Sequence, residues 1–137
     1  MKGFLKIDKE IEHVFENQEN LQSLFKEFNF HGTCVILGKE QLSISPSNNF
    51  EVVVKMEFLQ ENRSYLVDVY VHKDYPYKGH RVGFTNIHQY LDASRLWSLG
   101  ISKTGAVLSD DFHSMWSPAY NLSWLIKYIL TLILFEF

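Results

Sequence analysis

The most regular pattern in the chain is an alternation of apolar and mostly charged side chains from Phe50 to Phe58. From Tyr65 to His72 the same period recurs, with Tyr65, Val67, Val69 and Val71 alternating against Leu66, Asp68, Tyr70 and His72. A period of two residues is typical of a strand with one buried face. The polar loop Gln60 to Ser64 separates the two runs, so the pattern predicts two antiparallel strands joined by a hairpin.

Ahead of these strands, apolar side chains recur at helical spacing with Glu, Gln, Lys and Asn between them. This spacing predicts an amphipathic helix from about Asp8 to Phe28, with a break near Asn17 to Asn20 left open. Two short β-prone runs follow, Cys34 to Leu37 and Gln41 to Ser45, and we expect a turn at Gly38-Lys39 between them.

The last segment is strongly apolar and predicts a C-terminal helix. Ser117 is a suitable N-cap for it, and Pro118 suits the first helical position. A membrane-spanning helix needs about 20 apolar residues. This segment is shorter and carries Lys127, so we expect no transmembrane segment. The expected buried stripe consists of Leu122, Leu125, Ile126, Ile129, Leu130, Ile133 and Leu134.

The composition fits one compact domain, residues 1–137, because 46% of the 137 residues are hydrophobic. A formal net charge of −3 argues against a nucleic-acid partner. Cys34 is the one cysteine, which excludes an internal disulfide and fits a reducing compartment. The N-terminus lacks the apolar core of a signal peptide, so the cytosol is the default location. Import into an organelle such as the mitochondrion without a cleaved presequence stays open.

Two motifs resemble the ubiquitin-conjugating enzyme (UBC-like) family. The segment from Tyr75 to Thr85 matches the family's Tyr-Pro motif at Tyr75, Pro76, Val82, Phe84 and Thr85. The segment around the family's catalytic cysteine matches at Gly105, Asp110, Trp116, Ser117, Pro118 and Ala119. The resemblance implies an α+β, UBC-like fold: an N-terminal helix, a four-stranded antiparallel meander and a C-terminal helix packed on the sheet. The last two helices of the family would be missing.

The departures from the family concern its chemistry. Leu108 occupies the position of the catalytic cysteine, and leucine has no nucleophile. Gly100 occupies the position of the family's catalytic Asn, at the end of a longer segment, Asn86 to Ile101, in which we expect a short helical turn. The resemblance is therefore to the non-catalytic variants of the family, the UEV subgroup, and we expect no enzyme activity and no catalytic residue.

Other chemical signals are weak. Ser109, Asp110, Asp111 and His113 are close in sequence, but triad members normally come from separate elements, so a solvated turn is the expected structure. The six histidines show no zinc-ligand spacing, and no Gly-rich phosphate loop is present. We expect Cys34 to be a buried structural thiol. No metal or cofactor is expected.

Protein surfaces are the better candidates. An all-round apolar helix end needs cover, so we expect another protein subunit over Leu132, Phe135 and Phe137. Folding of the N-terminal helix or of the 86–101 segment over this end is the alternative. Phe4 and Leu5 are candidate docking residues at the N-terminus. The resemblance also implies a RING-ligase surface at Tyr77, Lys78, Ser117, Pro118 and Ala119.

These observations lead to three hypotheses. The first is a catalytically inactive UBC-like domain that serves as an accessory or structural subunit of a larger assembly. The second is a UEV-type cofactor that pairs with an active ubiquitin-conjugating enzyme and ubiquitin in chain formation. The third is an enzyme with an unrecognised nucleophile such as Cys34 or Ser109, which would form a covalent adduct with ubiquitin.

Overall fold

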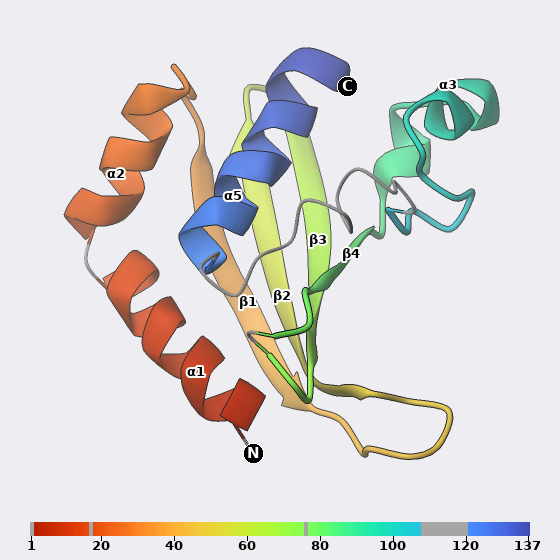
Figure 1. Cartoon of the computed structure of the whole chain (residues 1–137). Helices are drawn as coiled ribbons and strands as arrows, with labels where there is room; N and C mark the ends of the chain where they lie inside the picture. The colour runs from red at the N-terminus through yellow and green to blue at the C-terminus, as the bar shows by residue number, and fades with distance from the viewer. Residues whose placement is uncertain (1, 17, 76, 108–120) are drawn as a thin grey trace.

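The computed structural model describes residues 2–16, 18–75, 77–107 and 121–137, and it is an α+β fold. Four strands form one antiparallel sheet in the order β1-β2-β3-β4. Figure 1 shows helices α1, α2 and α5 on the same face of this sheet, while α3 stands beside the β4 edge. The predicted order of N-terminal helix, four-stranded meander and C-terminal helix is confirmed. The bounds are α1 Lys2–Ile11, α2 Gln18–Glu27, β1 Thr33–Gln41, β2 Phe50–Gln60, β3 Arg63–His72, β4 Arg81–Phe84, α3 Ala93–Ser98 and α5 Leu122–Thr131.

The N-terminal helical region begins earlier than predicted, at Lys2 rather than near Asp8. A π-helical turn, Glu12–Glu16, follows α1, and α2 starts at Gln18. The sequence left open a break near Asn17 to Asn20. The structure has two separate helices here, and the second begins at Gln18. Ile7, Val14 and Leu21 are buried, in agreement with the predicted apolar face.

Strands β2 and β3 are the centre of the sheet, and their alternation predicted them correctly. Val54 of β2 pairs with Val69 of β3, and both are buried on the face that the helices cover. The predicted loop from Gln60 to Ser64 is shorter than expected, because Gln60 already pairs with Arg63. Glu51 belongs to the polar positions of the predicted alternation, but it is buried. It lies next to a register shift between Phe50 and Val52.

Strand β1 corrects the sequence analysis. The two predicted runs around a Gly38-Lys39 turn are one continuous strand, Thr33–Gln41, with a bulge between Ile36 and Gly38. Extra length in one strand of a pair produces such a bulge, and a glycine inside a strand often marks one. Gly38 therefore marks an irregularity within the strand and not its end.

Strand β4 is short, with four residues, Arg81–Phe84, and it carries Val82 and Phe84 of the Tyr-Pro motif segment. The 86–101 segment contains a 3-10 turn, Ile87–Gln89, and helix α3, which confirms the expected helical structure there. Asp92 caps α3 by accepting a hydrogen bond from the backbone N–H of Arg95 at 2.8 Å.

The C-terminal helix α5 begins at Leu122, with Asn121 as its N-cap. The side chain of Asn121 accepts a hydrogen bond from the backbone N–H of Trp124 at 3.1 Å. The predicted cap, Ser117, and the predicted first helical residue, Pro118, lie outside the described residues. The predicted stripe is confirmed. Leu122, Leu125, Ile126, Ile129 and Leu130 of α5 are buried, and in the π-helical turn that follows, Leu132–Glu136, Ile133 is buried and Leu134 is half-buried.

A carboxylate ties three distant parts of the chain together. Glu10 of α1 accepts a hydrogen bond from the Tyr75 hydroxyl at 2.7 Å. It also accepts one from the backbone N–H of Leu122, the first residue of α5, at 2.9 Å. Because hydrogen bonds to charged groups are stronger than neutral ones, this arrangement fixes α1, the loop after β3 and the start of α5 relative to one another.

Candidate functional site

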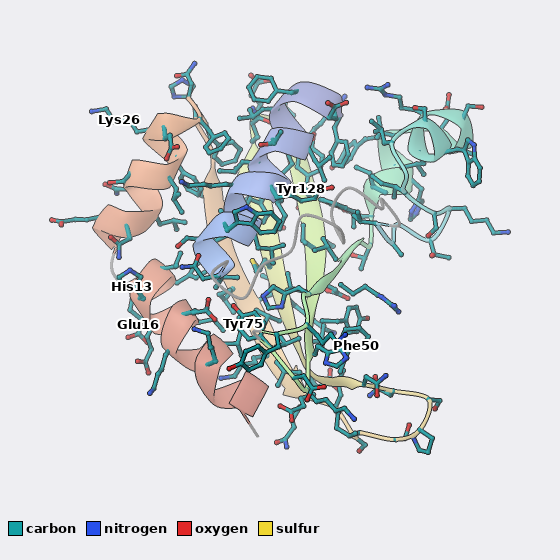
Figure 2. All side chains as sticks on the ribbon, in the orientation of Figure 1. His13, Glu16, Lys26, Phe50, Tyr75 and Tyr128 are labelled. Carbon is teal, nitrogen blue, oxygen red and sulfur yellow. The ribbon has the colours of Figure 1, made fainter. Side chains whose placement is uncertain are left out.

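The loop from Lys73 to His80 joins β3 to β4 and is anchored by one buried ring. Tyr75 is buried, its hydroxyl reaches Glu10, and its ring packs on the imidazole of His80 at 4.4 Å between centroids. Figure 2 shows Tyr75 directed toward α1. Tyr77, two residues further on, is 71% exposed. The loop therefore has a fixed base and an exposed rim.

His80 is buried at the base of this loop. Burial lowers its pKa from 6.5 to about 3, because the charged imidazolium would lose its hydration. His80 is therefore neutral at physiological pH, and it contributes no charge to the surface above it.

A pocket of about 370 Å³ lies over the loop, and basic and aromatic groups form its walls. The Arg81 guanidinium lies over the Phe50 ring, 5.0 Å from its centroid. The imidazole of His72 packs edge-on against the same ring at 5.6 Å. Figure 2 labels Phe50 at the end of the sheet where β2 begins. The residues that line the pocket are Phe50, His72, Tyr77, Lys78, Gly79, His80 and Arg81.

The charges at this pocket differ in sign from the charge of the whole chain. Between His72 and Arg81 the sequence has three cations, Lys73, Lys78 and Arg81, against one carboxylate, Asp74. Within the described part of the chain, neither Lys78 nor Arg81 forms an ion pair. The pocket therefore carries a local positive charge on a protein whose formal net charge is −3.

The structure brings together only part of the predicted site. Tyr77 and Lys78 both line the pocket, whereas Ser117, Pro118, Ala119 and Leu108 lie outside the described residues. Gly100 is in the turn after α3, at a positive φ of 71°. Phe4 and Leu5 belong to α1, and their side chains are not among those described.

The C-terminal helix end is less exposed than we predicted. Leu132 is buried within the chain, whereas we expected another protein subunit to cover it. Phe137 is half-buried and packs against Tyr65 and Phe84, at 6.0 and 5.1 Å between ring centroids. Phe135 alone of the three is strongly exposed, at 70%. The chain's own sheet supplies part of the cover that we assigned to a partner.

A second surface was missed by sequence reasoning and lies on the sheet face opposite to the helices. Val35 of β1 pairs with Glu57, and Thr33, two residues earlier, pairs with Leu59, so Val35 and Leu59 share that face. Val35, Leu37 and Leu59 are 44%, 56% and 40% exposed. No described helix covers this face in Figure 1. We name Val35, Leu37 and Leu59 the outer apolar patch.

Cys34 is the neighbour of Val35 in β1, but it lies on the inner face of the strand and is buried. Its thiol is buried, and desolvation raises its pKa far above the ordinary value of 9.0. A thiol that stays protonated is a poor nucleophile. This geometry argues against Cys34 as a catalytic residue, and Ser109 lies outside the described residues.

The described residues contain no cluster of three or more His, Cys, Asp or Glu side chains arranged to hold a metal ion. None of the described helices combines the length and the hydropathy needed to cross a bilayer.

The chain was compared with protein-family models, with curated proteins and with solved structures, and none of the three comparisons found a match. No family assignment follows from them. The class that the structure defines is an α+β domain with helices on one face of an antiparallel meander. The resemblance to ubiquitin-conjugating enzymes rests on the sequence motifs.

Proposed function

We propose that this protein is a non-catalytic UBC-like domain that acts as an interaction subunit of a larger protein assembly. The order of its elements agrees with the fold that the two sequence motifs imply. Leu108 at the family's cysteine position and the buried thiol of Cys34 both support a role without covalent catalysis.

The outer apolar patch is the observation that carries the proposal. Isolated exposed apolar residues are common on protein surfaces, but Val35, Leu37 and Leu59 lie on adjacent strands at one sheet edge. Residues 33–38 of this edge strand also carry no charge and no proline, the usual protections against strand association. A protein partner that covers this face would remove the exposed apolar area from water.

The experiment is an affinity purification from the native source of the wild type and of a Val35→Lys, Leu59→Lys double variant. Wild type should recover stoichiometric partners, and the variant should lose them, because a lysine cannot be buried in an apolar interface without a large desolvation cost. Gln22→Lys with Ser23→Lys, on the exposed side of α2, is the control of matched charge.

Three results would contradict the proposal. The first is a wild-type protein recovered alone, and the second is a variant with unchanged partners. The third is a covalent ubiquitin adduct formed in the presence of ubiquitin-activating enzyme. Recovery of one active ubiquitin-conjugating enzyme together with ubiquitin would replace the structural-subunit role by the chain-formation cofactor.

A further inference from the structure

We propose that the pocket over the Lys73–His80 loop is a binding site for a phosphate monoester carried on an apolar group. The pocket lies at the β3–β4 end of the sheet and is distinct from the outer apolar patch. The charges and rings of the pocket would hold such a ligand whether or not the chain resembles ubiquitin-conjugating enzymes or has the proposed function.

Arg81 is the first reason to expect an anion. Its guanidinium is held over the Phe50 ring at 5.0 Å, which restricts the side chain before any ligand binds. A planar guanidinium presents its N–H groups in a fork that matches two oxygens of a phosphate. Since Arg81 forms no ion pair in the described part of the chain, the fork is available to a ligand.

Lys78 supplies a second positive charge from the loop itself. It lines the same pocket as Arg81, and Gly79 between them adds no side chain to fill the space. Two unpaired cations match the charge of a phosphate monoester, which is near −2 at neutral pH. A carboxylate would neutralise only one of them. The charge balance therefore favours phosphate over carboxylate.

His72 supplies a hydrogen-bond donor on the β3 side. The backbone N–H of Asp74 donates to its Nδ1 at 3.0 Å, so the neutral ring carries its proton on Nε2. Burial lowers the pKa of His72, and Lys73 and Lys78 lower it further, while Asp74 and Glu51 act in the opposite direction. An anion beside Lys78 and Arg81 would add to the effect of the two carboxylates and raise this pKa.

Apolar walls explain why the ester group should be apolar. Phe50 and Tyr77 line the pocket together with the cations. Its volume of about 370 Å³ exceeds what a phosphate group alone would fill. A phosphate that carries an aromatic ring would place the ring against these side chains and the phosphate oxygens at Arg81 and Lys78.

The test is calorimetric titration of the protein at low salt with phenyl phosphate, phenyl sulfate and inorganic phosphate. Phenyl phosphate should bind at one site. Phenyl sulfate has the same shape with a single charge and should bind about 10-fold more weakly, as should inorganic phosphate, which lacks the ring. Arg81→Gln and Lys78→Gln should each weaken phenyl phosphate binding by about 10-fold or more. Lys103→Gln, in an exposed turn elsewhere, should not change it.

Proton NMR of the His72 ring is the second readout, because it reports on the pocket directly. At a phenyl phosphate concentration just sufficient to saturate the wild type, the pKa of His72 should rise in the wild type and rise less in the Arg81→Gln protein, which binds the ligand more weakly. Absence of phenyl phosphate binding, or equal affinity of wild type and both glutamine variants, would overturn the proposal. Equal affinity for phenyl phosphate and inorganic phosphate would overturn the role of the apolar walls.

A phosphotyrosine peptide distinguishes two sources of the same chemistry. At least 10-fold tighter binding of the peptide than of phenyl phosphate would identify a phosphorylated protein segment as the ligand. Equal binding would identify a small phosphate ester, since the flanking residues then add nothing. Competition between peptide and phenyl phosphate is expected in both cases, and its absence would place the peptide at another site and count against the pocket.

Discussion

His80 is a basic side chain that lies inside the protein, next to the ring of Tyr75. Its environment makes it a source of acid sensitivity. The ordinary pKa of 6.5 applies to the unfolded chain, whereas burial lowers the pKa in the folded protein to about 3. Between these two values the unfolded chain binds a proton that the folded protein does not, so stability falls as the pH falls below the unfolded value.

Replacement of His80 by glutamine tests this linkage. As the pH falls from about 7.5 to about 5, the titration of His80 should lower the unfolding free energy of the wild type by about 2 kcal/mol. His80→Gln lacks the titrating group, so its unfolding free energy should fall by about 2 kcal/mol less over the same interval. Urea unfolding at the two pH values measures both quantities, and the remaining five histidines cancel in the comparison. An identical pH dependence of the two proteins would contradict the assignment.

Gly105 shows what a single position imposes on a structural element. It has a positive φ of 93°, and its carbonyl accepts a hydrogen bond from the backbone N–H of Phe84 at 2.7 Å. The following residues pair with β4, where Val107 donates to the Val82 carbonyl at 2.9 Å. A Cβ at position 105 would overlap the carbonyl oxygen of Phe84. Glycine is therefore required for this segment to lie alongside β4.

We predict that Gly105→Ala lowers the unfolding free energy by about 2 kcal/mol or more, since it combines an unfavourable φ with a steric overlap. Gly83→Ala is the matched control. Gly83 lies in β4 opposite Ala106, and a Cβ there meets no atom within 4 Å. The control should therefore change stability by at most about 1 kcal/mol. Equal losses in the two variants, measured by chemical unfolding, would show that the conformation at position 105 is not the cause.

Elements with a strong period were predictable, and elements defined by one irregular residue were not. The alternation around Val54 and Val69 identified β2 and β3, because one face of each is buried. Gly38 was misinterpreted as a turn, since a glycine in a bulge and a glycine in a turn have the same local sequence signal. The described start of α5 has Asn121 as its N-cap, whereas the sequence offered Ser117, which is an equally good N-cap and lies outside the described residues.

The pocket was only half predictable for a related reason. Tyr77 and Lys78 follow a recognisable motif, but Phe50 begins a strand more than twenty residues earlier and meets Arg81 only through the pairing of β2, β3 and β4. A signal was present in the segment from His72 to Arg81, where three cations gather in an acidic protein. These cations form a pocket only together with the Phe50 ring, and the sequence alone does not show that Phe50 lies beside Arg81.

At the scale of the whole molecule, the C-terminal residues of the described chain connect parts that are distant in sequence. Phe137 packs on Tyr65 of β3 and on Phe84 of β4. Next to it, the carbonyl oxygen of Glu136 accepts a hydrogen bond from the Arg95 guanidinium of α3. Tyr90 of the 86–101 segment also packs on Tyr65, at 5.4 Å between ring centroids. The end of the helical layer is thus joined to both the sheet and the 86–101 segment.

This arrangement predicts opposite roles for two phenylalanines near the end of the chain. Phe137→Ala should lower the unfolding free energy by about 1–3 kcal/mol, because a half-buried ring loses its contacts with Tyr65 and Phe84. Phe135→Ala is the matched control and should stay within about 0.5 kcal/mol, because that ring is 70% exposed. Urea unfolding measures both, and near-ultraviolet circular dichroism follows the aromatic cluster. Equal stability of the two variants would contradict the packing of Phe137, whereas the predicted difference would leave Phe135 as the ring that a partner protein can contact at this end.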